Sequence, residues 1–409
     1  MNRYLFSGWI FVISLVFVSC SGNDYLNAIP KNSTALVSVD MSRIAGERKG
    51  VNESLMKAWF HVSDPSDCGI DMSAKVYLFE APDGHLGMVA KVKDDDNIID
   101  WLNTMAKQGR CQKVQNRRGY HFTILNKSWV VGFNEAAFLI MGPVVSVEQA
   151  ELMRKMMKYL EAEEGIMDSP LFAKLNEIDS SVAMVSQAQA LPEQFIAPFT
   201  IGAPANTPPD KVLVAAGMKV EDGCLLIEGE TFSFDEKIDS ALKSVSHIYR
   251  PVTGVFLDQI PAEATYGLLM NVDGDQMLPL MKQSDAFRAM LTGMSVKIDI
   301  DGFMQRINGD LLMVVPSASN GQMQMQWAAQ MKSGVPPLDA DSEAELARCR
   351  LTLPTRKLPE KIRNSMKQVH MCMFINLSGV EGEKKTVTDA FTSLLKPIFG
   401  EVKYILYQS

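Results

Sequence analysis

The sequence lacks the linear signatures of several familiar enzyme classes. It has no G-x-S-x-G nucleophile elbow, no G-x-x-x-x-G-K-[ST] phosphate loop, no G-x-G-x-x-G dinucleotide fingerprint and no H-E-x-x-H zinc helix. The histidines also show no paired spacing that would suggest a shared site. The five histidines are His61, His85, His121, His247 and His370. We therefore predict no catalytic residue and no cofactor.

Positive charge is also scarce, with 40 Lys and Arg against 48 Asp and Glu, for a net charge of -8. A nucleic-acid partner would need basic residues to neutralise its phosphates, so none is predicted. One basic stretch departs from this balance and contains a single acid, Glu360. It could meet an anionic head group or an acidic partner, although a solvated face is the simpler interpretation. Its basic residues are Arg348, Arg350, Arg356, Lys357, Lys361, Arg363 and Lys367.

Cysteine is sparse, and its spacing does not suggest metal binding. Beyond Cys20 there are five cysteines, none in a C-x-x-C pair, so we expect buried thiols or a bridge. His370 and Cys372 lie two residues apart in a strand-like segment, which argues against zinc. Residues 271–275 and 299–302 resemble calcium loops faintly, but they lack the required Gly and Glu. We predict turns there and no metal site.

The N-terminus carries a targeting signal. Arg3 is followed by an apolar run from Leu5 to Val18 and then by small residues. This run is shorter than the roughly twenty residues that a membrane-spanning helix needs, and its layout is typical of a secretory signal. We predict that residues 1–19 form a signal peptide and that the protein is exported.

The end of this signal resembles the lipobox of bacterial lipoproteins. The residues Phe17-Val18-Ser19-Cys20 carry the resemblance, although Phe17 replaces the usual Leu. It implies that Cys20 is acylated, for example with palmitate, and that residues 20–24 form a lipidated N-terminus and tether. Ser21 in second place resembles lipoproteins sorted to the outer membrane. A single acid in the next few residues favours the periplasmic face over the cell surface.

The length and an internal echo predict two related domains. A chain of 409 residues is long for a single core. The segment from Tyr25 to Pro30 is echoed by the segment from Phe256 to Pro261, 231 residues later, and Thr34 matches Thr265 in the same register. We predict domain 1 at residues 25–250 and domain 2 at residues 251–409, the second being a possible repeat of the first.

The local patterns alternate strands with amphipathic helices. Acidic residues 94–96 are expected to cap one helix, and capping boxes at residues 146–149 and 342–345 are expected to open two others. Residues 120–141 predict a three-stranded meander, and residues 212–232 predict a hairpin. We therefore predict an α+β fold of antiparallel or mixed sheets, with helices packed on one face.

Methionine is unusually frequent, at 26 residues. Some methionines form stripes that could line an adaptable groove for a lipid or peptide. The simpler interpretation is that they replace leucine in the core. The stripes comprise Met153, Met156 and Met157, and Met323, Met325 and Met331.

Taken with the lipobox, residues 24–31 and the strand-like segment 35–40 resemble a family of Bacteroidota lipoproteins that carry a domain of unknown function. That resemblance implies a location and an architecture but transfers no site residue. Our leading prediction is an outer-membrane-associated protein, anchored through Cys20, that acts as a non-enzymatic binding or scaffolding module for an unidentified protein, lipid or glycan. The alternatives are an envelope hydrolase built from distant carboxylates and histidines, and a carrier with a Met-lined cavity between the repeats.

Overall fold

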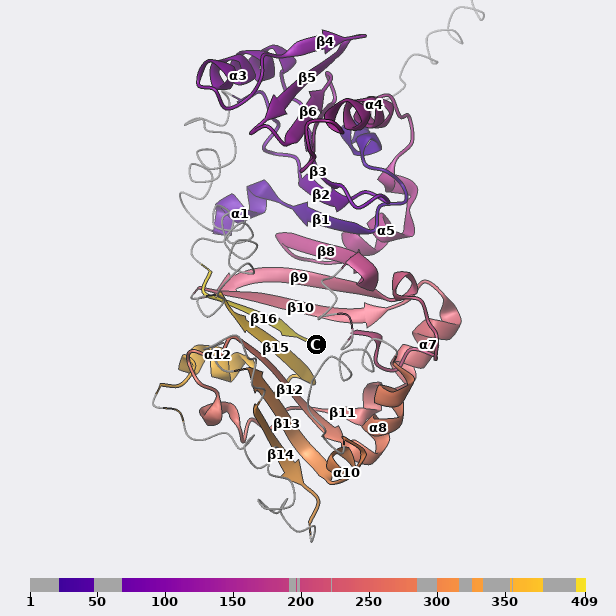
Figure 1. Ribbon diagram of the computed structural model, residues 1–409, viewed down its shortest axis with the longest axis vertical. Helices are drawn as coiled ribbons and strands as arrows, with labels where there is room; N and C mark the ends of the chain where they lie inside the picture. Colours follow the sequence, from indigo (N-terminus) through magenta and orange to yellow (C-terminus); the bar gives the residue numbers. More distant parts are fainter. Residues whose placement is uncertain are drawn as a thin grey trace, which may run out of the picture.

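The computed structural model describes residues 22–47, 68–190, 196, 199–221, 223–284, 300–315, 326–333, 354, 356–377 and 402–409. Within these residues a single sheet of sixteen strands runs along the length of the molecule (Figure 1). The strands are β1 Ala35–Val39, β2 Val76–Glu80, β3 Leu86–Lys91, β4 Gln115–Arg117, β5 Tyr120–Leu125, β6 Trp129–Phe133, β7 Ala137–Gly142, β8 Val182–Gln187, β9 Leu213–Glu221, β10 Cys224–Phe232, β11 Tyr249–Arg250, β12 Tyr266–Asp273, β13 Ile307–Val315, β14 Gln326–Met331, β15 Met371–Asn376 and β16 Tyr404–Gln408.

The sheet is mixed because one pair of neighbouring strands is parallel. Its order is β14-β13-β12-β15-β16-β10-β9-β8-β1-β2-β3-β7-β6-β5-β4, with β11 beside β12. The last strand of the chain, β16, pairs parallel with β10 and antiparallel with β15. The C-terminus therefore lies near the middle of the molecule rather than at an end (Figure 1).

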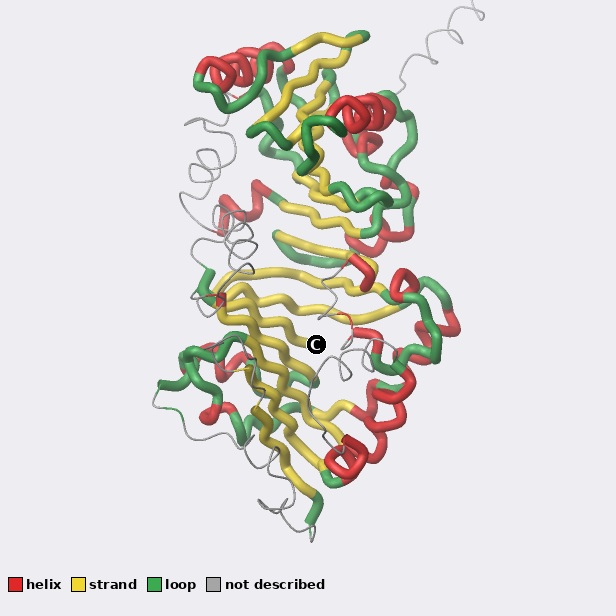
Figure 2. Tube along the Cα trace, viewed as in Figure 1, coloured by secondary structure: helices red, strands yellow, loops and turns green. Residues whose placement is uncertain are grey.

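Helices lie along both sides of this sheet (Figure 2). The α-helices are α1 Met41–Glu47, α3 Asp95–Lys107, α4 Gln149–Leu160, α5 Pro170–Asn176, α7 Glu236–Ser244, α8 Gly274–Gln283, α10 Ile300–Gln305 and α12 Glu360–Ser365. Short 3₁₀ turns that matter below are η2 Asp24–Ala28, η8 Ser246–Ile248 and η9 Leu257–Gln259.

Strand β10 shows which helices share a face of the sheet. Phe232 belongs to the buried cluster that includes residues of α4, α5 and η2, while Leu226 belongs to the cluster that includes residues of η9 and α12. These two residues are six apart on one strand, so their side chains point to the same side, which we call the first face. Ile227 points the other way, into the clusters of α1 and α3 and of α8 and α10, which cover the second face. The predicted packing of helices on one face is therefore wrong, because buried strands alternate apolar residues toward both faces.

The two parts of the chain are arranged alike around β10. On one side the order is β9-β8-β1-β2-β3, and on the other it is β16-β15-β12-β13-β14. The N–H of Thr34 donates to Glu80 at the end of β2, at 2.9 Å. In the same way, the N–H of Thr265 donates to Val315 at the end of β13, at 2.9 Å. The echoed segments thus enter the sheet through the same hydrogen bonds, although a division into two domains at residue 250 stays a prediction.

Several local predictions are confirmed. The side chain of Asp94 accepts a hydrogen bond from the N–H of Asn97 at 2.9 Å and so caps α3. Strands β5, β6 and β7 form the predicted meander, and β9 and β10 form the predicted hairpin. The helix that follows this hairpin, α7, is capped by Asp235. Acidic residues at helix starts satisfy N–H groups that the helix itself leaves unpaired.

Other local predictions are wrong. The capping box at residues 146–149 does not form, because α4 begins at Gln149 after a turn in which the N–H of Glu148 donates to Val145. Residues 271–275 are not a turn, since Asp273 ends β12 and its side chain caps α8. Asp301 lies inside α10. The capping box expected at residues 342–345 lies outside the described residues.

Candidate functional site

The candidate site is a strip of the first face that lies between α5 and α12. Its floor is formed by β9, β10 and β16. On the parts of the first face that α5 and α12 cover, the side chains are apolar, whereas in the strip between these helices they include polar residues. The carboxylate of Glu228 lies 3.2 Å from the Lys219 ammonium and accepts a hydrogen bond of 2.8 Å from the Gln408 amide. Polar residues of this kind mark a part of the sheet that faces solvent rather than a helix.

The strip contains a hollow beside α12 that we call the junction hollow, with a volume of about 320 Å³. Its lining combines apolar, hydroxyl and cationic side chains. The lining residues are Cys224, Leu226, Pro359, Lys361, Ile362, Ser365, Lys403 and Tyr404. Leu226 and Ile362 are 5% and 6% exposed, so the base of the hollow is apolar core. None of the eight residues carries a carboxylate.

A second hollow, the terminal hollow, lies further along β10 and also measures about 320 Å³. It is more open to solvent than the junction hollow. It is lined by Glu228, Gly229, Gln368, Val369, His370, Gln408 and Ser409. The backbone N–H of His370 donates to the carbonyl of Ser409 at 2.8 Å, which fixes the end of β16 against the loop after α12. The two hollows lie on one strip but differ in charge, because the terminal hollow contains the carboxylate of Glu228.

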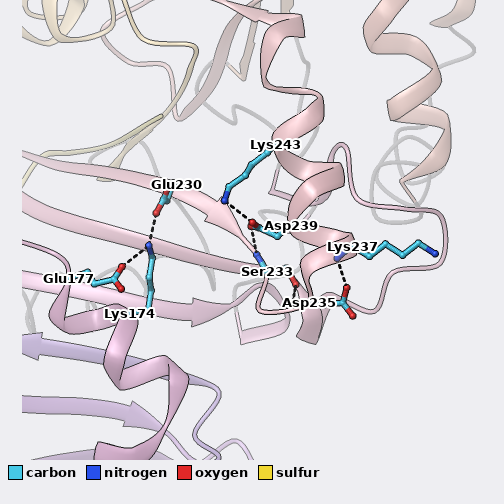
Figure 3. A network of polar contacts seen from close by, with 8 residues as sticks. All are labelled: Lys174, Glu177, Glu230, Ser233, Asp235, Lys237, Asp239 and Lys243. Carbon is cyan, nitrogen blue, oxygen red and sulfur yellow. Dashed lines mark hydrogen bonds and ion pairs between the residues drawn. The ribbon is translucent and has the colours of Figure 1, made fainter.

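On the side of α5, ion pairs fix the edge of the strip (Figure 3). The ammonium of Lys174 lies 2.9 Å from Glu230 on β10 and 3.1 Å from Glu177 at the end of α5. It also lies 5.2 Å from the centre of the Phe232 ring. These contacts raise the pKa of Lys174, chiefly through its hydrogen bond to Glu230, so the ammonium stays charged across the physiological range.

On the opposite side, Asp258 forms ion pairs with two basic residues of the α12 region. Its carboxylate lies 3.3 Å from Lys357 and is also bonded by the guanidinium of Arg363. The Arg363 Nε additionally donates to the carbonyl of Leu358 at 3.0 Å. Part of the predicted basic stretch is thus an internal ion-pair network, while Lys361 lies at the junction hollow. Arg348 and Arg350 lie outside the described residues.

Tyr404 brings a phenol to the junction hollow in its neutral form. Burial raises its pKa, and the nearby Arg356 guanidinium opposes that shift only in part. At neutral pH the Tyr404 hydroxyl therefore remains a hydrogen-bond donor. The neighbouring Cys224 is a buried free thiol.

A separate polar cluster joins the β2–β3 hairpin to α4. The Asp83 carboxylate lies 2.8 Å from the His85 ring nitrogen Nδ1 and is bonded by the ammonium of Lys155. Burial opposes ionisation of Asp83, but the hydrogen bonds from Lys155 and His85 outweigh it and lower its pKa to about 2. The cluster holds a hairpin against a helix, and its carboxylate is fully committed to these two partners.

Within the described residues, the remaining histidines and cysteines do not gather into a site. His121 stacks on Phe133 with ring centres 5.0 Å apart, and His247 lies in η8. Cys68, Cys111 and Cys372 are free thiols, like Cys224, so no bridge joins these four. Cys20, His61 and Cys349 lie outside the described residues. In the part of the chain that the structure describes, no three His, Cys, Asp or Glu side chains gather closely enough to hold a metal ion.

The methionine stripe of α4 is core filler. Met156 is fully buried, and Met153 and Met157 pack half-buried against the same cluster. Met331 packs against the core beneath α8, while Met323 and Met325 lie outside the described residues. These described methionines line neither hollow, so the predicted Met-lined cavity does not form from them.

The protein thus has one mixed sheet with helices on both faces, and the polar strip lies near the centre of this sheet. The model of the family described as Domain of unknown function (DUF4836) matches residues 41–335. This is most of the chain, which therefore belongs to that family. The expectation of a domain of unknown function is confirmed, and the matched segment crosses the predicted domain boundary at residue 250.

No curated protein matches the chain. Among solved structures, crystal form I of TP0453 shares 11% identity at a TM-score of 0.30, covering 49% of this chain and 74% of that chain. Crystal form IV of TP0453 shares 11% identity at a TM-score of 0.31, with coverages of 49% and 76%. At these TM-scores the likeness carries no argument about this protein.

The strip could not be located from sequence because its residues come from distant parts of the chain. The Gln408 amide and the Glu228 carboxylate that it bonds are 180 residues apart. One local signal does exist, since Glu228 and Glu230 break the apolar pattern on one side of β10. That alternation indicates a solvated face but cannot identify the helices on either side of it.

Proposed function

We propose that the protein is a lipid-anchored envelope protein, held in the outer membrane by acylated Cys20, that binds a partner or ligand without catalysing a reaction. The observation that carries the anchor is the lipobox-like run that ends at Cys20, five residues before Tyr25. Several acyl chains make such an anchor stable, because each buried methylene contributes about 0.8 kcal/mol.

The fold begins almost at the proposed anchor. Tyr25 and Leu26 are already buried, at 4% and 2% exposure, where η2 packs against β3, β7 and α4. Three residues lie between Cys20 and Asp24, and these four residue steps reach about 14 Å even when fully extended. An acylated Cys20 would thus hold the end of the molecule that carries α4 close to the bilayer, with the second part of the sheet farther away (Figure 1).

None of the helices in the described ranges is both long and apolar enough to cross a bilayer. Membrane attachment in this proposal therefore depends on Cys20. The binding role is supported by the strip, which offers two hollows on a rigid sheet floor. Concave sites on a rigid scaffold are where small ligands most often bind.

Metabolic labelling with an alkyne palmitate analogue tests the anchor. We expect the wild-type chain to be labelled and to sediment with membranes, and Cys20→Ser to lose both properties. Cys111→Ser is the matched control, because Cys111 is a half-buried free thiol that donates to the carbonyl of Leu102 at 3.2 Å. The anchor proposal fails if Cys20→Ser keeps its label.

Protease treatment of intact cells tests the membrane face. A chain on the periplasmic face should resist the protease until the outer membrane is permeabilised. Digestion in intact cells would place it on the cell surface instead. The labelling result is independent of this outcome, so anchor and orientation are tested separately.

A further inference from the structure

We infer that the junction hollow binds a single-chain amphiphile with an anionic head group, a carboxylate or a phosphate. The inference rests on the binding role proposed above and adds the chemical class of the ligand. It does not depend on acylation at Cys20.

The base of the hollow is suited to an acyl chain. Leu226 on β10 and Ile362 on α12 both line it and belong to one apolar cluster, together with Cys224. Leu226 and Ile362 are almost wholly buried, so packing holds both side chains in place. A volume of about 320 Å³ is at the lower limit for small-ligand sites, which suits one short chain segment and excludes a two-chain lipid body.

The rim of the hollow is suited to an anion. Lys361 and Lys403 are exposed there, with the hydroxyls of Ser365 and Tyr404 beside them. The Tyr404 phenol is protonated at neutral pH, and burial raises its pKa further, so its hydroxyl can donate a hydrogen bond to an anionic oxygen. Two ammonium groups, two hydroxyl donors and no carboxylate form the polar lining, within a chain whose net charge is -8.

The positive charge of the lining is a property of the junction hollow and not of the whole strip. The terminal hollow on the same strip contains the Glu228 carboxylate, which pairs with Lys219. Near α12, Asp258 forms ion pairs with both Lys357 and Arg363, and its carboxylate does not line the junction hollow. The two hollows therefore differ in their lining residues: the junction hollow has lysines above an apolar base, whereas the terminal hollow contains a carboxylate. Lysines above an apolar base are expected at a site that binds a charged head group on an apolar tail.

The test is a titration of the purified mature chain in a non-ionic detergent with dodecyl phosphate, followed by native mass spectrometry. We expect one bound molecule per chain. A Lys361→Gln/Lys403→Gln double variant should bind at least tenfold more weakly. Lys367→Gln is the matched control, because it removes one exposed charge two residues beyond α12 without touching the lining. It should bind like the wild type.

Two further probes separate head from tail. Inorganic phosphate should bind far more weakly than dodecyl phosphate, because it cannot occupy the apolar base. Dodecanol should also bind more weakly, because it lacks the charge that the lysines contact. Equal binding of either probe, unchanged binding by the double variant, or no bound dodecyl phosphate would overturn the inference. Loss of palmitate labelling with intact dodecyl phosphate binding would overturn only the anchor.

Dodecanoate in place of dodecyl phosphate tells the two head groups apart. Tighter binding of the carboxylate would indicate a free fatty acid as the natural ligand. Tighter binding of the phosphate would indicate a phosphorylated single-chain lipid. Either result supports an anionic amphiphile.

Discussion

At the residue scale, the hydrogen bonds of the buried Asp310 carboxylate show that its role is structural. Asp310 is fully buried in β13 and accepts hydrogen bonds from the backbone N–H groups of Thr253, Gly254 and Val255 at 3.0, 2.7 and 3.3 Å. The Thr253 hydroxyl adds a fourth bond at 2.8 Å. All four of these hydrogen bonds come from the loop that leads into η9. A buried acid of this kind positions backbone and is not available for chemistry.

Asp83 gives a pH-dependent prediction at the same scale. The pKa of Asp83 in the folded protein is lowered to about 2, from about 3.9 for an ordinary aspartate. Because the folded value lies below the unfolded one, the contribution of Asp83 to stability is complete above about pH 4 and is lost as the pH falls toward 2. Since a third of the side chain is exposed, we expect Asp83→Asn to lower the free energy of unfolding by only about 1 kcal/mol at pH 6.

Thermal unfolding of both proteins between pH 6 and pH 2.5 checks this prediction. The difference between their midpoints should shrink steadily as the solution is acidified. A difference that stays constant over this range would show that Asp83 is not the group that titrates.

At the element scale, three glycines in strands lie beneath phenylalanine rings. Gly87, Gly132 and Gly267 pair across the sheet with Phe79, Phe122 and Phe374. A Cβ added to each glycine would lie 2.1, 2.6 or 2.0 Å from a ring atom of its partner. All three rings are buried on the first face, so the glycine leaves the space that the ring fills.

We therefore expect Gly267→Ala to destabilise the protein by about 2 kcal/mol, since the Phe374 ring must move within a packed core. Gly22→Ala is the control, because its added Cβ would approach only the ammonium of Lys91, at 3.5 Å. Chemical denaturation with intrinsic fluorescence measures both. A Gly267→Ala protein as stable as the control would mean that the ring relaxes at no cost.

The elements themselves were largely predictable, whereas their assembly was not. Strand and helix positions follow from local signals such as Asp94 before α3 and the Gly-containing turn between β9 and β10. Whether helices cover one or both faces of the sheet depends on which strands become neighbours. No local sequence pattern contains that information. The same is true of β16, whose partner β10 ends 172 residues before β16 begins. The capping box at residues 146–149 failed for a related reason, since the turn at Val145 sets where α4 begins.

At the scale of the whole molecule, β16 joins the two halves of the chain. It belongs to the second half, after residue 250, yet it pairs with β10 of the first half over five residue positions. Leu406 of β16 and Leu226 of β10 are aligned in this pairing and lie in one buried cluster with α12. The sheet thus has no break at residue 250, although the order of strands on either side of β10 fits a duplicated unit.

This continuity makes a prediction about cooperativity. Leu406 is fully buried, so Leu406→Ala should cost about 3 kcal/mol through lost contacts and the remaining cavity. Because Leu406 lies at the join, hydrogen exchange should accelerate in β9 and β10 as well as in β12 and β15. Leu102→Ala removes an equally buried leucine under α3 and should affect only the first half. If Leu406→Ala accelerates exchange in the second half alone, the two halves are independent domains that merely share an edge. If it accelerates exchange in both, one cooperative sheet holds the junction hollow in place, because that hollow is built from β10 and β16 together.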